Sequence, residues 1–276
     1  MLLLLLLQVF ASCLWLGHSE VVADFQSCPQ FFFQATPPSK ALLPNSAAYI
    51  CQRFNNQHYY ATLYNRDMRI PVYSAYLYDP QNTTKPGNVW MIEPQLLGTN
   101  YPNAMEKEKK FMHESNVTLQ QIMVTQAVSG DYKNLKDFDH GHMSPSYHRP
   151  TFNSKKSTFT LTNVVPQYKE LNDGKWSYYE MQIMINKTKG CNTTYVVVGA
   201  VPGNNFIGGD RVNIPSHIWS SACCEMDNNQ MNAWGVIAEN DKNEIELLSL
   251  GDLENRLNKL YNKPDVSLFH SDCPRQ

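Results

Sequence analysis

Hydrophobic and polar side chains alternate over several stretches of the chain, and this pattern predicts a protein rich in β-strands. Residues 59–65 and 70–79 are rich in Tyr, Val, Ile and Thr and are separated by a short polar turn, so we expect a β-hairpin. A further strand is expected at 157–167, ended by Pro166. Three more strands are expected at 193–201, 212–225 and 231–240.

Other stretches have the spacing of a helix. Residues 106–128 combine mixed charges with scattered apolar positions, and residues 176–189 repeat bulky apolar side chains at helical intervals until Gly190 ends the segment. The last helix is expected to begin at Asp252, a good N-cap residue, with leucines along one face. Because strands and helices are mixed without βαβ alternation, the sequence predicts the α+β class and a single domain.

Composition and charge narrow the class of protein. The chain has 276 residues, of which 42% are hydrophobic and 12% aromatic, and this excludes a disordered chain. Its formal net charge of −2 excludes a basic protein that grips nucleic acid by bulk electrostatics. Any partner must therefore be recognised at a local site.

The N-terminus has the pattern of a targeting signal. An apolar run at residues 2–16 is followed by the small residues Gly17 and Ser19, which predicts a signal peptide at 1–19 with cleavage near Ser19 or Glu20. A signal anchor is the alternative, but the run is shorter than the ~20 residues that span a bilayer. We expect a secreted, extracellular protein without a membrane span.

Secretion favours disulfides and N-glycans. Six cysteines follow the predicted signal, which is the even number expected for three disulfides, and fifteen pairings are conceivable. Cys223 and Cys224 are adjacent, so we expect them to pair with different partners; a zinc site is disfavoured because no C-x-x-C spacing occurs. The six are Cys28, Cys51, Cys191, Cys223, Cys224 and Cys273. Four sequons predict N-glycans at Asn82, Asn116, Asn186 and Asn192.

Histidines gather in one segment. Residues 137–148, DFDHGHMSPSYH, hold three of the eight histidines within nine residues. A solvated loop is the first interpretation. The second is a metal site that uses His140 and His142, which we disfavour because we expect the two side chains to point to opposite faces of a strand. The third is a catalytic histidine held by Asp139, with Gly141 allowing close approach of a ligand. The local pattern leaves all three open.

A second segment extends this pattern. Asp139-His140-Gly141-His142 is followed by Asn163-Val-Val-Pro166-Gln167, then by Asn172 and Glu180 after nine and eight further residues. This ordered set resembles the signature of the DNA/RNA non-specific endonucleases, the ββα-metal nucleases. The resemblance runs from about Tyr60 to Leu260, and the phrases RIPVYSAYLY, EPQL and IPSHIW resemble the secreted vertebrate branch. It implies a ββα-metal core with a mixed or antiparallel sheet flanked by helices.

The resemblance implies a role for each matched residue. His142 would be the general base that deprotonates water, and Asn172 would be the direct protein ligand of Mg²⁺, with Mn²⁺ as a substitute. Glu180 would orient a metal-bound water, Asn163 would hold the loop or His142 by hydrogen bonds, and Asp139 would be a structural orienter. Taken alone, Asn172 has the alternative of an ordinary turn residue and Glu180 that of a solvated helix face.

Two departures from the family signature concern its arginines. The signature arginine is His140 here, so a permanent cation is replaced by a titratable ring. The second arginine, which precedes a Trp in the family, is absent before Trp90, and Lys85 is the nearby cation. If protonated His140 substitutes, activity should rise below about pH 6.5. Arg149 is a further candidate for a phosphate contact.

Four segments and two functions are therefore expected. The segments are the signal peptide 1–19, a disulfide-anchored extension 20–56, an endonuclease-like domain 57–265 and a tail 266–276 with Cys273. The first function is a secreted Mg²⁺-dependent endonuclease that cleaves the phosphodiester backbone of DNA and RNA with little sequence preference. The alternative is a catalytically weak or inactive secreted glycoprotein that uses the nuclease fold as a binding module.

Overall fold

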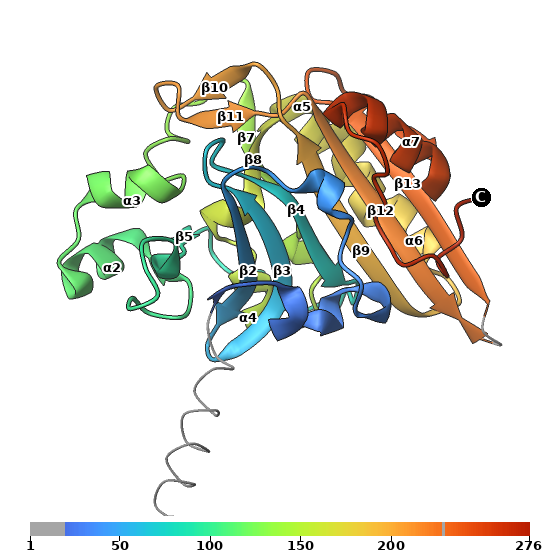
Figure 1. The fold of residues 1–276 in the computed structure, drawn as a ribbon, viewed down its shortest axis with the longest axis horizontal. Coiled ribbons are helices and arrows are strands. Elements are labelled where there is room, and N and C mark those ends of the chain that lie inside the picture. Colours follow the sequence, from blue (N-terminus) through green and yellow to red (C-terminus); the bar gives the residue numbers. More distant parts are fainter. Residues whose placement is uncertain (1–19, 228–229) are drawn as a thin grey trace, which may run out of the picture.

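An eight-stranded antiparallel sheet lies at the centre of the molecule, in the order β1-β2-β3-β4-β9-β12-β13-β14 (Figure 1). The structure is a computed structural model that describes residues 20–227 and 230–276. The strands of this sheet are β1 (Val21–Val22), β2 (Ala47–Phe54), β3 (Gln57–Asn65), β4 (Ile70–Leu77), β9 (Cys191–Val201), β12 (His217–Met226), β13 (Met231–Glu239) and β14 (Glu246–Leu248).

Smaller ribbons and helices surround the sheet. Three two-stranded antiparallel sheets are β5 (Met91–Ile92) with β6 (Glu106–Lys107), β7 (Phe138–His142) with β8 (Val164–Tyr168), and β10 (Asn205–Ile207) with β11 (Val212–Ile214). The α-helices are α2 (Glu108–Ser115), α3 (Leu119–Thr125), α4 (Phe152–Ser157), α5 (Lys169–Leu171), α6 (Met184–Lys187) and α7 (Leu250–Tyr261). Short helical turns are η1 (Phe25–Ser27), η2 (Pro29–Phe31), η3 (Phe33–Ala35), η4 (Lys40–Leu42), η5 (Pro94–Leu96), η6 (Ser146–His148) and η7 (Leu161–Asn163), and two π-helical turns are η8 (Asn172–Trp176) and η9 (Tyr179–Ile183).

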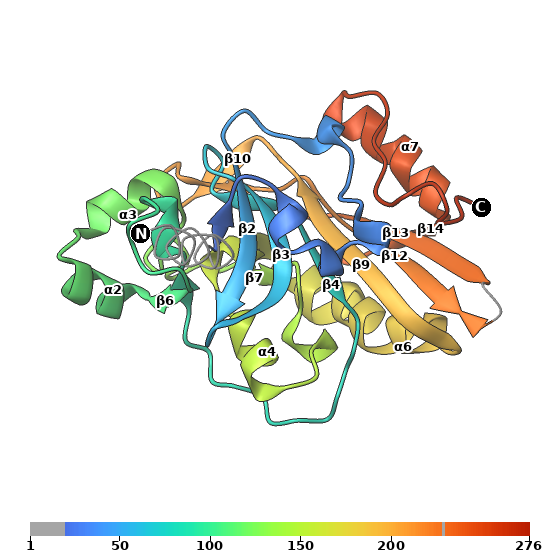
Figure 2. The same cartoon turned by 60° about the horizontal axis from the view of Figure 1, so that its bottom comes forward.

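The central sheet buries a hydrophobic core on each face. Successive side chains of a strand point to opposite faces, and in β9 Val196 and Val198 join one core whereas Val197 and Val201 join the other. The N-terminal turns, α7 and the C-terminal tail cover the second core, while the β7–β8 ribbon and the helical segment from α5 to α6 cover the first (Figures 1 and 2). The sheet therefore separates two layers with different contents.

Several expected elements are confirmed. Residues 59–65 and 70–79 form the hairpin of β3 and β4, and the strands expected at 193–201 and 231–240 are β9 and β13. The segment expected as a strand at 212–225 is two strands, β11 and β12, with Pro215 and Ser216 between them. The α+β class and the single domain are likewise confirmed.

The strand expected at 157–167 is wrong in most of its length. Ser157 ends α4, a helical turn follows at Leu161–Asn163, and only β8 is extended. Pro166 lies inside β8 and pairs with His140 instead of ending the strand. A two-stranded ribbon accepts a proline because each of its strands has a free edge, where a missing N–H breaks no ladder hydrogen bond.

Helix ends also differ from the sequence pattern. The helical stretch at 106–128 is two helices, because Asn116 ends α2 in the left-handed conformation (φ 50°) and Thr118 begins α3 with a capping box. The last helix begins at Leu250, two residues before the expected Asp252. Ser249 is its N-cap, its hydroxyl accepts the Asp252 backbone N–H at 3.1 Å, and Asp252 lies in the first turn.

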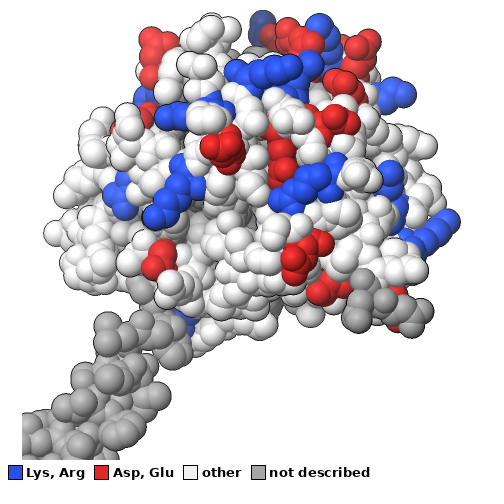
Figure 3. All heavy atoms as spheres, turned by 45° about the vertical axis from the view of Figure 1, so that its right-hand side comes forward, with Lys and Arg blue, Asp and Glu red and all other residues white. Residues whose placement is uncertain are grey.

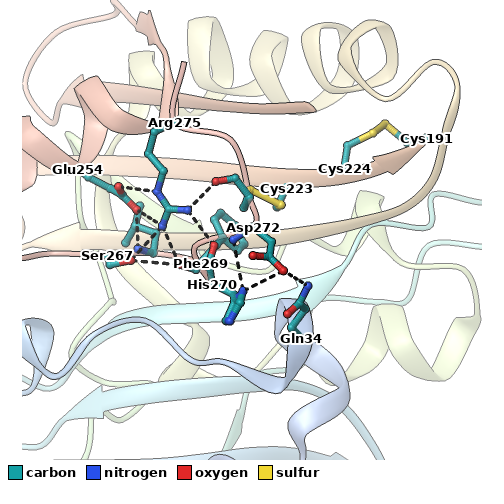
Figure 4. The surroundings of a disulfide bond; sticks show 12 residues. Gln34, Cys191, Cys223, Cys224, Glu254, Ser267, Phe269, His270, Asp272 and Arg275 are labelled. Carbon is teal, nitrogen blue, oxygen red and sulfur yellow. Dashed lines mark hydrogen bonds and ion pairs between the residues drawn. A yellow bond between two sulfur atoms is a disulfide. The ribbon is translucent and has the colours of Figure 1, made fainter. Parts of the chain in front are cut away.

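Three disulfides use all six described cysteines: Cys28–Cys51, Cys191–Cys224 and Cys223–Cys273. The adjacent Cys223 and Cys224 pair with different partners, as expected, because neighbouring strand residues face opposite cores. Figure 4 shows Cys223 bonded to the C-terminal tail beside the guanidinium of Arg275. This pairing leaves no described cysteine free for the disfavoured zinc site.

The predicted signal peptide at residues 1–19 lies outside the described residues. Within residues 20–227 and 230–276, no helix is both long enough and apolar enough to cross a membrane. The asparagines of the four sequons are all solvent-exposed.

Candidate active site

The β7–β8 ribbon and the helical segment after it form the layer that holds the predicted site residues. His140 pairs with Pro166 and His142 with Val164 across the ribbon, and the chain then continues from β8 into α5. The rings of His140 and His142 both contact Trp90, at centroid distances of 4.1 and 5.5 Å. The two histidines therefore share one face, as residues two apart in a strand do, and the expectation of opposite faces is wrong.

Gly141 permits the ribbon to close. A Cβ atom at this position would lie 2.2 Å from Oε1 and 2.4 Å from Cβ of Gln167, so any larger residue would push the two strands apart. The side-chain amide of Gln167 is fully buried, and neither of its polar atoms has a hydrogen-bond partner among the described residues. Native proteins rarely leave a buried amide unpaired, so Gln167 is a position where a water or ligand could bind.

His142 lies in an aromatic setting. Besides Trp90 it packs edge-to-face on Phe159, at a centroid distance of 5.2 Å. Its Nε2 atom is closed to bulk water and has no hydrogen-bond partner among the described residues. Burial lowers the pKa of His142 to about 4, and the nearby charges of His140 and Lys85 act in the same direction. The imidazole is therefore neutral at pH 7, the form that accepts a proton.

His140 is held between two aromatic rings. Trp90 stacks on one face (4.1 Å, 9° between planes) and Tyr132 on the other (4.3 Å, 18°). Asp139 Oδ1 accepts the backbone N–H of His140 at 2.7 Å and lies 3.4 Å from its ring Nδ1. Burial lowers the pKa of His140 and the Asp139 carboxylate opposes this shift. The pH range in which His140 carries a proton, and in which the expected rise in activity would occur, is therefore shifted to lower pH.

Asn163 fixes the loop that follows β7. Its Oδ1 accepts hydrogen bonds from the Ser74 hydroxyl (3.0 Å) and the Ser144 backbone N–H (2.9 Å). Its Nδ2 donates to the backbone carbonyls of Ser144 and Thr158, both at 3.0 Å. The fully buried amide thus joins β4, the turn after His142 and the approach to β8.

Asn172 and Glu180 lie on the helical segment between α5 and α6, which contains the π-helical turns η8 and η9. Such turns are rare and occur often at functional sites. Asn172 is half-buried, and its side chain makes no hydrogen bond within the described part of the chain. Asn243 anchors the start of the segment, because its Oδ1 accepts the Lys175 backbone N–H at 2.8 Å.

The Glu180 carboxyl is an acid without a nearby cation. Burial raises its pKa to about 8, the nearby indole N–H of Trp176 opposes the shift, and no basic side chain contributes. Since both Asn172 and Glu180 offer hard oxygen atoms, the pair suits a hydrated divalent cation that takes few protein ligands. Within residues 20–227 and 230–276, no group of three His, Cys, Asp or Glu side chains is arranged to hold a metal.

His148 and Arg149 serve the structure of the site. The ring of His148 joins the Tyr76 hydroxyl (2.8 Å) to the Glu180 backbone carbonyl (2.9 Å), which ties η6 to η9. Arg149 is buried, and its guanidinium donates to the backbone carbonyls of Leu77 and Tyr59. Its Nη1 and Nη2 atoms are thus bonded to the backbone, whereas its Nε has no partner among the described residues. Because the whole side chain is buried, this geometry gives no support to the candidate phosphate contact at Arg149.

Two site residues have no signal in the sequence. Tyr132 and Phe159 complete the aromatic walls around His140 and His142, yet they lie outside the motif segments. Only the three-dimensional arrangement of the loops before β7 and after α4 brings them to the histidines. Their tyrosine and phenylalanine identities alone predict burial and nothing more.

Surface charge is mixed on the side of the molecule toward α7, where Lys and Arg alternate with Asp and Glu (Figure 3). No single-sign field covers this view, in keeping with the formal net charge of −2.

Comparisons with known proteins agree on the family. The human endonuclease domain-containing 1 protein is 29% identical over 259 residues, which cover 92% of this chain and 49% of that protein. Its mouse counterpart is 29% identical over 258 residues, covering 91% and 48%. The mitochondrial nuclease EXOG of Xenopus laevis is 29% identical over 158 residues, covering 52% and 42%. The chain thus spans about half the length of the curated relatives it matches.

A solved structure supports the fold. The crystal structure of the EndoG/EndoGI complex, described for the mechanism of EndoG inhibition, contains a chain with a TM-score of 0.52 and 16% identity; the match covers 76% of this chain and 83% of that one. At this identity the likeness concerns the fold alone. The family model for DNA/RNA non-specific endonucleases matches residues 38–275. With the ordered motif residues in one layer and this match over most of its length, the chain belongs to the DNA/RNA non-specific endonuclease family.

Proposed function

We propose that this chain is a secreted endonuclease that hydrolyses phosphodiester bonds of DNA and RNA, depends on Mg²⁺, and uses His142 as its general base. The observation that carries the proposal is the neutral imidazole of His142, whose Nε2 has no protein partner, on a strand whose layer also holds Asn172 and Glu180. A base needs a nitrogen that is both unprotonated and uncommitted at working pH.

The remaining motif residues position this base. Asn163 fixes the turn directly after His142 through four hydrogen bonds. Asp139 accepts the His140 backbone N–H and orients the His140 ring between Trp90 and Tyr132. A ring clamped in this way presents a donor to the substrate phosphate when it carries a proton, the task that an arginine performs in the family signature.

Asn172 and Glu180 would hold the divalent cation. The amide oxygen of the half-buried Asn172 would bind the cation, and the cation would supply the charge that the Glu180 carboxyl lacks. Bound there, Mg²⁺ would stabilise negative charge on the phosphorus oxygens and on the leaving oxygen. Glu180 would orient a water of the cation, and His142 would accept the proton of the attacking water.

Weak binding of substrate follows from the charge of the site. Arg149 is committed to backbone carbonyls and the family arginine is His140, so few permanent cations contact the phosphate. A preorganised charged donor stabilises a phosphoryl transition state by about 2–4 kcal/mol. The same observation supports the second candidate, a secreted glycoprotein of low activity that uses the fold as a binding module, with N-glycans at the four exposed sequons.

Plasmid nicking by the purified protein separates the two candidates. We expect nicking with Mg²⁺ or Mn²⁺, none with EDTA, and a raised Mg²⁺ requirement in Asn172→Ala. Asn255→Ala, an exposed asparagine of α7 on the other side of the sheet, is the matched control and should behave as the unaltered protein. Nicking that persists in EDTA would contradict the metal dependence, and no nicking under any of these conditions would favour the binding module.

A further inference from the structure

A pocket of about 780 Å³ is lined by Met181 and Tyr147, which directly follow Glu180 and precede His148, and none of the candidate catalytic residues lines it. The loop between β4 and β5 forms one wall with Lys85 and Asn82, η6 forms a second with Tyr147, and the segment after Glu180 forms the floor with Met181 and Ile185. Pockets that bind small organic groups have volumes of about 300–1,000 Å³. The space is therefore large enough for a nucleoside.

Hydrogen bonds fix the segments that line this pocket, which we call the nucleoside pocket, to neighbouring parts of the fold. Lys155 closes one side, because its ammonium donates to the backbone carbonyls of Gln81 (2.8 Å) and Thr83 (3.0 Å) and holds the loop against α4, as Figure 2 shows. His148 follows Tyr147 directly, and its ring is hydrogen-bonded to the Tyr76 hydroxyl of β4 and to the Glu180 backbone carbonyl of η9, so the chain on either side of the pocket is anchored next to Tyr147 and Met181. The pocket is thus preformed in this structure.

The chemistry of the lining fits a base and a phosphate. Tyr147 is 42% exposed, and Met181 (38%) and Ile185 (40%) add apolar surface to the same pocket. Lys85 is an exposed residue of the pocket lining, and its charge lowers the pKa of His142. Bases stack on aromatic rings regardless of sequence, and an ammonium binds the adjoining phosphate.

We infer that this pocket receives an unpaired nucleobase next to the scissile phosphate, with Tyr147 stacking on the base and Lys85 contacting the backbone. The inference rests on the proposed function for its reaction but not for its binding. A base reaches such a pocket only from a single strand or after leaving a duplex, which carries an unstacking cost of a few kcal/mol. The site therefore prefers single-stranded over duplex nucleic acid.

Binding is tested in protein that carries His142→Ala, to prevent cleavage, and Asn82→Gln, to remove the sequon at the pocket rim. The probes are a thymidine trinucleotide and the same trinucleotide without its central base. We expect Tyr147→Ala to weaken binding of the first about tenfold, a typical stacking contribution, and to leave the second unchanged. Lys85→Ala should weaken both probes. Phe152→Ala, an aromatic residue that is 51% exposed outside the pocket, is the matched control.

The same variants are then compared for cleavage in protein that retains His142. Tyr147→Ala should raise KM for a single-stranded oligonucleotide and leave kcat nearly unchanged, whereas Phe152→Ala should alter neither. Equal binding of the two trinucleotides, or no effect of Tyr147→Ala, would overturn the nucleoside pocket even if nicking occurs. Base-dependent binding through Tyr147 in a protein that nicks nothing would uphold the pocket and reject the proposed hydrolysis.

Discussion

The two faces of the central sheet treat their buried polar groups differently. On the face covered by α7 and the tail, the guanidinium of Arg275 donates to Glu254, to Ser267 and to the backbone carbonyls of Phe269, His270 and Cys273 (Figure 4). On the opposite face, His142 Nε2 and the Gln167 amide have no partner among the described residues. The polar groups named on the first face are hydrogen-bonded, whereas on the other face some buried polar atoms have no hydrogen-bond partner among the described residues.

The two faces therefore differ in what their buried polar groups contribute to the protein. Paired groups and the Cys223–Cys273 disulfide stabilise the tail against the sheet. Unpaired groups destabilise a protein by about 1–3 kcal/mol each unless a ligand satisfies them. The comparison therefore assigns stability to the α7 face and reactivity to the face of β7 and β8.

The largest effect is expected at Arg275. Replacing it with Ala removes five donors from a largely buried network and leaves Glu254 without its cation, so the free energy of unfolding should fall by about 4 kcal/mol. The nicking rate of the folded protein should stay unchanged. Chemical denaturation measures the first quantity, and Arg256→Ala, an exposed arginine of α7, the helix that carries Glu254, is the control. If Arg275→Ala lost nicking but kept its stability, the assignment of stability to the α7 face would be wrong.

Acid should destabilise the site face selectively. Burial lowers the pKa of both His142 and His148 to about 4. Below pH 6.5 the two histidines are therefore protonated in the unfolded chain but stay neutral in the folded chain, and folding becomes less favourable as the pH falls. Glu180 acts in the opposite direction, since its pKa is raised to about 8 and the unfolded chain loses its proton near pH 4.5.

For these two histidines and one carboxyl, the balance is a loss of about 2 kcal/mol of stability between pH 6.5 and 4.5. Denaturant titrations at several pH values measure it. In His148→Gln the stability should vary little with pH over this range, because one histidine and one carboxyl then cancel. His113→Gln, an exposed histidine of α2, should keep the full slope. A flat profile in the unaltered protein would contradict the lowered pKa values.

Asn163 should affect both stability and activity. Asn163→Ala removes four hydrogen bonds at a fully buried position, and we expect about 2 kcal/mol less stability together with a slower nicking rate, because the turn after His142 loses its anchor. Asn213 is a buried amide of similar bonding that holds β10 and β11, so Asn213→Ala is the matched control. The control should lose stability alone; equal loss of nicking in both variants would remove the positioning role of Asn163.

Gln167 should show the smallest effect and the opposite sign. Gln167→Met removes an unpaired buried amide while keeping its volume, so stability should rise by about 1 kcal/mol and nicking should slow. Gln126→Met replaces a fully buried amide that bonds both the N–H and the carbonyl of Glu93, so this control should lose stability. A Gln167→Met protein that is more stable and fully active would show that the open amide serves no chemistry.

The order and spacing of Asp139, His142, Asn163 and Glu180 could be matched to the family signature from the sequence, and the structure places Asp139 and His142 on β7 and Glu180 on η9. Their catalytic roles stay predictions. The aromatic clamp around His140 could not be predicted, because Tyr132 and Trp90 reach it from distant loops. The strand expected at 157–167 failed because β-branched residues there pack in turns held by Asn163 instead of pairing in a sheet. Tertiary contacts overrode local propensity at these positions.

The most direct test of the central claim compares activity and stability in one variant. His142→Asn keeps a polar side chain of similar extent but cannot act as the base. We predict that its Mg²⁺-dependent plasmid nicking falls at least about 100-fold while its free energy of unfolding stays within about 1 kcal/mol of the unaltered protein. Nicking that survives in a stable His142→Asn protein would contradict the assignment of reactivity to this open histidine.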